Sequence, residues 1–116
     1  MEINKKFNWL PPSDWHIYGT RKNGAKFLKP EAKAMKEEIG WEFKGFKVSE
    51  KGRFGMEIIF RVPHKKNFDL NRRVGIIMDA LQGIIYKDDN QITELFLYKE
   101  SAGKEMTEIY VYSLEE

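Results

Sequence analysis

Three short polar runs in the second half of the chain have the composition of a site for phosphodiester chemistry. They read Asp69-Leu70-Asn71-Arg72-Arg73, Met78-Asp79-Ala80-Leu81 and Tyr86-Lys87-Asp88-Asp89-Asn90-Gln91. Hydrolysis of a phosphodiester needs carboxylates because hard magnesium ions prefer oxygen ligands, and the bound ion activates water and offsets charge on the phosphate. The alternative is structural: an Asp-Asp pair before a strand is common in a solvated turn.

Helices and strands must bring these runs together. Apolar residues at helical spacing predict two helices, over residues 30–39 and 70–81, which Gly40 and Gly83 are expected to end. Asp69 stands where an N-cap would satisfy free amides of the second helix, which is its alternative role.

Strands are predicted over residues 3–10, 41–49, 54–62, 92–99 and 105–113. The order βαββαββ predicts an α/β (α+β) fold, a small mixed sheet with two main helices.

The segment from Ser13 to Lys29 is predicted to be a mobile, cationic loop, because it mixes glycine and asparagine with several basic residues. Trp15 lies in this loop, where it suits either a dimer contact or a wedge into opened DNA. Trp9 and Trp41 fall in strand-like segments and are expected in the core or an interface.

The bulk composition sets limits on the class of protein. The 116 residues fit one domain, residues 1–116. Without cysteine the chain forms no disulfide or thiolate metal site, and it begins with no signal-peptide pattern and has no apolar run long enough to span a bilayer. We therefore expect a cytoplasmic protein with no membrane partner.

The net charge of +2 is unevenly distributed. Residues 61–73 contain five basic residues and one acidic residue, a net charge of +4, whereas residues 88–116 contain two lysines and eight acidic residues, a net charge of −6. The middle of the chain is therefore the basic part.

The order and spacing of the polar runs resemble those of the RusA-like Holliday junction resolvases, a family of crossover junction endodeoxyribonucleases with the motifs Asp-Leu-Asp-Asn-Leu, Asp-Ala-Leu and Asp-Asp-Xaa-Gln. The front of the chain agrees. Leu10-Pro11-Pro12-Ser13 and Lys26-Phe27-Leu28-Lys29-Pro30-Glu31-Ala32 resemble the family's opening Pro-Pro-Ser and its later Phe-Leu-Ser-Xaa-Glu-Ala stretch. The resemblance thus covers nearly the whole chain.

This resemblance implies a homodimeric α/β endonuclease of DNA recombination and repair, which binds four-way junctions by their shape and cuts symmetric strands with Mg²⁺ or Mn²⁺. The family's catalytic aspartates correspond to Asp69, Asn71 and Asp89. A metal site would draw on these residues and Asp88. Asp79, beside the apolar stripe of its helix, is assigned a supporting role instead of direct metal ligation.

Three functional positions depart from the family pattern. Asn71 replaces an aspartate, Arg72 replaces an asparagine, and Gly75 replaces the lysine that the family uses in catalysis. Asn71 still offers a carbonyl oxygen but removes a negative charge, so weaker metal affinity is expected. Gly75 falls inside the predicted helix, where glycine costs about 1 kcal/mol relative to alanine, and close backbone packing is one explanation.

Basic residues near the acidic runs are the expected contacts to the DNA backbone, with a merely solvated surface as the alternative. This set comprises Lys65, Lys66, Arg72, Arg73, Arg21 and Lys26. Three functions remain open at this point. The chain is a weakened metal-dependent endonuclease, a junction-binding protein that no longer cuts, or, from another class, a single-strand RNA-binding module, for which the expected aromatic strand signature is absent.

Overall fold

The structure is a computed structural model, and it describes residues 1–45 and 48–114. Its centre is a four-stranded sheet in the order β1-β6-β4-β5. These strands are β1 (Glu2–Phe7), β4 (Arg53–Pro63), β5 (Ile92–Ala102) and β6 (Met106–Leu114). The sheet is mixed, because β4 pairs with β5 in parallel and with β6 antiparallel, while β1 pairs antiparallel with β6.

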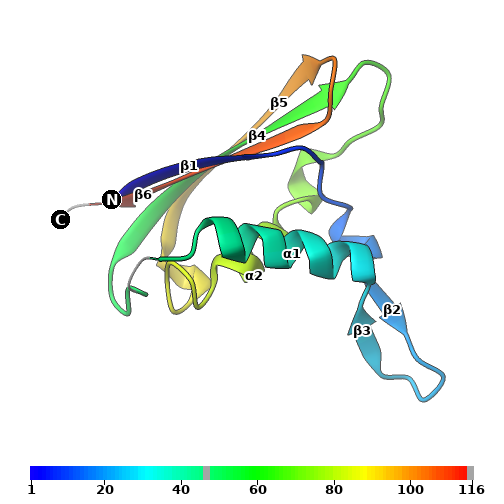
Figure 1. Cartoon of the computed structure of the whole chain (residues 1–116), viewed down its shortest axis with the longest axis horizontal. Helices are drawn as coiled ribbons and strands as arrows, with labels where there is room; N and C mark the ends of the chain where they lie inside the picture. Colours follow the sequence, from blue (N-terminus) through cyan, green and yellow to red (C-terminus); the bar gives the residue numbers. More distant parts are fainter. Residues whose placement is uncertain (46–47, 115–116) are drawn as a thin grey trace.

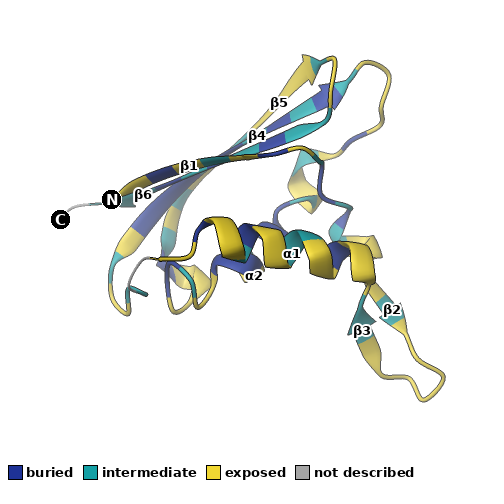
Figure 2. Ribbon diagram, viewed as in Figure 1, coloured by how far each residue is buried: buried dark blue, intermediate teal, exposed yellow. Residues whose placement is uncertain are grey.

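Two helices, α1 (Pro30–Glu42) and α2 (Gly75–Leu81), lie side by side against one face of this sheet (Figure 1). A small hairpin of β2 (Tyr18–Thr20) and β3 (Lys26–Leu28) projects from the body of the molecule near the start of α1 (Figure 1). The hairpin is largely exposed, whereas the inner faces of the sheet and helices are buried (Figure 2).

Alternation along the strands explains which face carries the core. In β4 the side chains of Phe54, Met56, Ile58 and Phe60 are buried, while the residues between them, except Gly55, are partly exposed. β6 repeats the pattern with Ile109 and Val111. Because successive side chains point to opposite faces of a strand, these residues form one apolar surface, onto which Ile39 of α1 and Ile77 of α2 pack.

The predicted fold class is confirmed: the chain has two main helices and a small mixed sheet, with an additional hairpin. The predicted order βαββαββ differs from the structure before and after the first helix. The loop predicted over residues 13–29 contains the hairpin and a short 3₁₀ helix, η1 (Asp14–His16). The strand predicted over residues 41–49 is wrong: α1 continues through Gly40 to Glu42, residues 43–45 form a turn, and Ser49 makes only an isolated bridge to Tyr86.

Part of that predicted strand, residues 46–47, lies outside the described residues. Trp41 is 71% exposed on α1, so the expected core position is wrong. The reason is periodicity: α1 presents Ala32 and Ile39 to the core, and position 41 falls on the opposite, wet side.

The helix predicted over residues 70–81 is in fact two pieces, a 3₁₀ turn η2 (Leu70–Arg72) and α2. Asp69 precedes η2 but makes no side-chain capping hydrogen bond. Gly75 is therefore the first residue of α2, and the expected mid-helix cost of glycine does not apply to it. No helix in residues 1–45 and 48–114 is long and apolar enough to span a membrane.

Candidate functional site

The Asp88-Asp89-Asn90-Gln91 run forms a compact turn, η3 (Asp89–Gln91), immediately before β5. Asp88 is its N-cap: the carboxylate accepts a hydrogen bond of 3.0 Å from the Asn90 N–H. The Gln91 side chain accepts from the backbone N–H of Asp88 at 3.0 Å, which completes a capping box. The Asp89 side chain is left exposed, free to meet a ligand.

Gln91 anchors this acidic turn to the rest of the fold. It is a buried polar side chain whose Oε1 also accepts from the Lys87 N–H at 2.9 Å. Its amide nitrogen donates to the Ser49 carbonyl at 3.1 Å and to the Gly52 carbonyl at 2.7 Å. All the hydrogen-bonding capacity of the side chain is thus used to fix η3 against the segment that leads into β4.

The second acidic segment, Asp69 to Arg73, lies elsewhere in the molecule. Asp69 and Asn71 are exposed, and η2 places them just before α2. The Lys99 ammonium donates to the Phe68 carbonyl at 3.1 Å, which fixes this segment beside the far half of β5. η2 and η3 consequently lie near opposite ends of α2 (Figure 1).

The two acidic segments are fixed at different points along β5. Lys99, which holds the Asp69 segment, stands seven residues beyond Ile92, the first residue after η3, and seven residues of extended strand measure about 23 Å. Within the described residues, no three His, Cys, Asp or Glu side chains gather closely enough to hold a metal ion. The oxygen donors proposed for a metal therefore do not form a completed cluster within one chain.

Comparison with known proteins defines the family. The model of the endodeoxyribonuclease RusA family matches residues 10–112. The chain belongs to the RusA endodeoxyribonuclease family. Curated proteins give no match. The RusA family acts as metal-dependent Holliday junction resolvases, so the family places this chain among DNA-directed proteins and does not support the single-strand RNA alternative.

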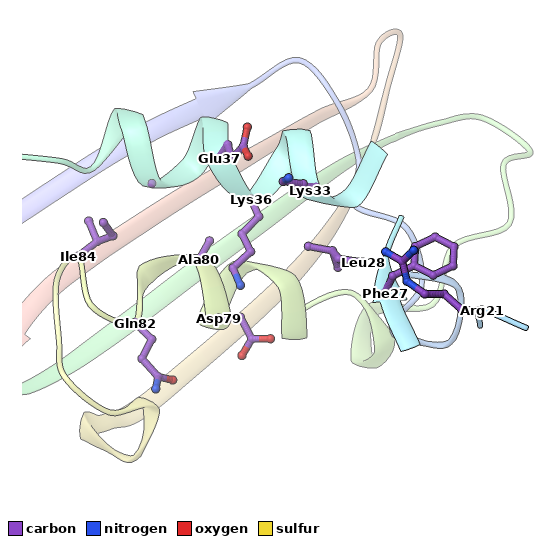
Figure 3. Close-up of a pocket in the computed structure, with 11 residues that line it drawn as sticks. Arg21, Phe27, Leu28, Lys33, Lys36, Glu37, Asp79, Ala80, Gln82 and Ile84 are labelled. Atoms are coloured by element: carbon purple, nitrogen blue, oxygen red, sulfur yellow. The ribbon is translucent and has the colours of Figure 1, made fainter. Parts of the chain in front are cut away.

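Asp79 lies on α2, between the segment that carries Asp69 and the turn that carries Asp89 in the sequence. Its carboxylate lines a cavity of about 650 Å³ between the hairpin and the two helices, together with Lys36 of α1, whose side chain extends toward it (Figure 3). Burial raises the pKa of the Tyr86 hydroxyl, and the negative charges of Asp89 and Asp79 raise it further. Tyr86 donates to the Met78 carbonyl at 2.8 Å, so this phenol is a neutral structural group between the carboxylates.

Gly75, for which the motif resemblance predicts a lysine, is explained by a neighbour that the sequence does not reveal. A Cβ atom built on Gly75 would lie 2.8 Å from Oδ1 and 3.0 Å from Cγ of Asp14. Such a contact is too close, so the carboxylate occupies the space into which a lysine stem would have to pass. The expected close packing is found, and its partner is Asp14 of η1.

The electrostatic environment of Asp14 is mixed. Burial raises the pKa of its carboxyl group above the ordinary value, and the nearby Gly75 N–H opposes this effect. The charge of Asp79 raises the pKa further, while the two guanidinium groups of Arg73 and Arg72 lower it. Asp14 is thus held next to the motif that carries Asn71, although no spacing signal in the sequence connects residues 14 and 75.

The six basic residues predicted to contact DNA have different surroundings. The Arg73 guanidinium donates to the Pro11 carbonyl at 3.0 Å and lies 4.4 Å from the Phe68 ring, so it links two segments of the protein. Lys66 forms an ion pair with Glu105. Lys65 is exposed in a turn with a φ of 70°.

The other three basic residues surround the hairpin. Arg21 lies over the Phe27 ring at 5.1 Å, and Lys26 is exposed on β3. Arg72 lies over the Trp15 ring at 4.6 Å. The hairpin and η2 thus share a cationic surface, in which Lys26 and Arg72 line the same cavity.

Proposed function

We propose that this chain is a Holliday-junction-directed protein of the RusA family whose metal-dependent cleavage is much weaker than its binding of the junction. The proposal is supported by the family match over residues 10–112, combined with Asn71 and Gly75 at two positions to which the motif resemblance assigns catalytic roles. Recognition of DNA needs a basic surface, which the chain retains, whereas cleavage needs the acids and the lysine, which are partly lost.

For binding, we infer that phosphate groups are held by the cationic surface of the hairpin and η2. Arg21, Lys26 and Arg72 are the principal contacts, and Lys65 and Lys66 extend the surface. Arg73 has a lesser role because its guanidinium is already bonded to Pro11. A Lys66 contact would compete with its ion pair to Glu105.

For cleavage, the available oxygen donors are Asp69, Asp88, Asp89 and the side-chain carbonyl of Asn71. Mg²⁺ or Mn²⁺ bound by such donors supplies an activated water and offsets charge on the phosphate. The separation of η2 from η3 and the absence of a third clustered acid among the described residues favour weak occupancy of this site. One capping hydrogen bond also occupies Asp88, which makes Asp89 the better placed of the pair.

A second copy of the chain is part of the proposal, since paired cuts across a four-way junction require two sites. The exposed side chains of Leu95, Phe96 and Tyr98 on β5 support it. β5 is an edge strand of the sheet, and exposed apolar residues at such an edge are a common feature of contact surfaces.

The test separates binding from cutting. The protein is incubated with a synthetic four-way junction and a linear duplex of matched sequence, in magnesium, manganese or chelator. We expect preferential binding of the junction, with slow nicks in the presence of metal that are lost in Asp89→Asn. Asn71→Asp is expected to bind equally well and to nick about tenfold faster, since it restores one ligand charge.

Two results would change the conclusion. Selective binding without any nick, in wild type and in Asn71→Asp, would identify a junction-binding protein that has lost cleavage. Gly75 and the neighbouring Asp14 carboxylate favour this second candidate function, because together they leave no room for a lysine. Equal affinity for junction and duplex contradicts the junction proposal itself.

A further inference from the structure

Trp15 has an unusual setting for a tryptophan. Its side chain is 68% exposed, although large aromatic side chains are normally well buried. It belongs to η1, which Ser13 caps by accepting from the Trp15 N–H. The Asp14 carboxylate beside it packs against Gly75 of α2. The backbone at Trp15 is therefore fixed on both sides while its ring is presented to solvent.

The surroundings of this ring form a cavity of about 590 Å³, a volume typical of small-ligand pockets. It is lined by Asp14, Trp15, Tyr18, Thr20, Lys26 and Arg72. The cavity thus combines two aromatic rings, two cations, a hydroxyl group and one carboxylate. Its polar groups lie on three separate elements: η1, the hairpin and η2.

This composition matches one kind of ligand. An unpaired nucleobase offers a flat aromatic face for stacking, polar atoms along its edge, and an attached phosphate that attracts cations. Arg72 lies over the Trp15 ring at 4.6 Å, and Tyr18 is 48% exposed at the rim. Lys26 supplies the second cation, and Thr20 and Asp14 supply hydrogen-bonding partners for a base edge.

The Asp14 carboxylate closes one side of this cavity. Its Oδ1 atom faces Gly75, 2.8 Å from where a Cβ atom would lie, and the nearby Gly75 N–H favours its charged form. A side chain at position 75 would displace this carboxylate, so Gly75 allows Asp14 to line the cavity.

We infer that this cavity receives one unstacked base of a branched DNA, with the base stacked on the Trp15 ring and its phosphate held by Arg72 and Lys26. The inference rests on the proposed function and deepens it, because a base is displaced easily only where the duplex is already opened, as at the crossover of a junction. Arg72 adjoins Asn71, so the captured nucleotide would lie next to the segment that carries the catalytic motif.

The experiment uses the full chain and a four-way junction with the fluorescent base 2-aminopurine at the crossover or, in a second junction, in the middle of an arm. Wild type is expected to alter the emission at the crossover and not in the arm. Trp15→Ala should abolish this difference and weaken junction binding about tenfold, with duplex binding unchanged, because stacking of one base is lost. Trp15→Phe should retain most of both effects.

The matched control is Trp41→Ala. Trp41 is 71% exposed and also lies under a cation, with the Lys44 ammonium 4.0 Å from its ring, but it is on the far end of α1. This variant should behave as wild type, and thermal melting checks that every variant is folded. If Trp15→Ala binds and alters emission as wild type does, the base-capture inference is overturned while junction recognition stands. If wild type binds junction and duplex equally well, the proposed function itself is contradicted, and the base-capture inference that rests on it is contradicted too.

Discussion

At position 75 the absence of a side chain makes room for the Asp14 carboxylate. This pairing connects η1, far back in the sequence, with the first residue of α2. A lysine at position 75, which the motif resemblance predicts, would compete with Asp14 for the same space.

Gly75→Ala is expected to lower the free energy of unfolding by about 1 kcal/mol, because displacing Asp14 outweighs the better helix propensity of alanine. In an Asp14→Ala background the same change should be neutral or stabilising. Urea unfolding of the four proteins of this double-mutant cycle measures the coupling. Equal effects of Gly75→Ala in the two backgrounds would show that the contact has no energetic weight.

Gln91 is the second residue whose role comes from its contacts. Gln91→Ala removes the hydrogen bonds that this buried side chain donates to the partly buried carbonyl groups of Ser49 and Gly52. We expect a loss of about 2–3 kcal/mol of unfolding free energy in urea titration. Asn90→Ala, an exposed neighbour in the same turn, is the control and should change stability by less than about 0.5 kcal/mol.

Among the elements, the four strands are joined on their open face by a chain of polar side chains. Asn4 of β1 donates to Glu108 of β6 at 2.9 Å, and Arg61 of β4 donates to the same carboxylate at 2.7 Å. The Arg61 guanidinium also lies 3.8 Å from Glu100 of β5. This chain crosses every strand of the sheet and fixes their register where the helices give no cover.

The pKa of Glu108 gives this network a pH dependence. Burial raises the pKa, but hydrogen bonds from Arg61 and Asn4 outweigh it, and the result lies below the ordinary value of 4.5. A lowered pKa in the folded state contributes stability above the pKa of the unfolded chain, and this contribution is lost as the pH falls through the folded value.

Glu108→Gln should therefore lower the free energy of unfolding by about 1.5 kcal/mol at pH 7 and show less acid destabilisation than wild type below pH about 4.5. Urea unfolding at several pH values measures both effects, and parallel pH profiles would contradict the assignment.

The β2–β3 hairpin was not predicted from the sequence, which indicated a loop over these residues. Between Tyr18 and Lys29 it has four basic residues and no acidic residue, and it stands away from the sheet (Figure 2). Lys26→Ala is expected to weaken binding of junction and duplex alike and to reduce the slope of log affinity against log salt by about 1. Fluorescence anisotropy over a range of KCl concentrations measures the slope. Lys104→Ala, exposed in the turn between β5 and β6, should leave the slope unchanged.

For the whole molecule, the proposal with the widest consequence is that a second copy of the chain binds along β5. Phe96 and Tyr98 lie on the face of the sheet opposite to the helices and are 44% and 46% exposed. Light scattering coupled to gel filtration is expected to give twice the chain mass of 13.7 kDa. Phe96→Glu combined with Tyr98→Glu should give the monomer mass with an unchanged circular dichroism spectrum, because charge is placed in the proposed contact. A dimer that survives this change must form through another surface.

The sequence by itself determined the family, the fold class and the core. Alternation in β4 and the apolar spacing in the helices are local patterns that do not depend on distant contacts, so they predict elements well. The acidic runs were found for the same reason, since each is contiguous. The predicted helix boundaries were wrong where the local signal was ambiguous. At Gly40, for example, α1 continues to Glu42 although this glycine was expected to end the helix.

Tertiary structure alone decided how these runs relate to one another. Whether Asp69 approaches Asp89 depends on the path of the chain around α2, and the structure places η2 and η3 near opposite ends of this helix. The contact of Asp14 with Gly75 and the cavity beside Trp15 join residues about sixty positions apart. Such contacts come from the packing of whole elements, for which a single sequence has no periodic or contiguous signal.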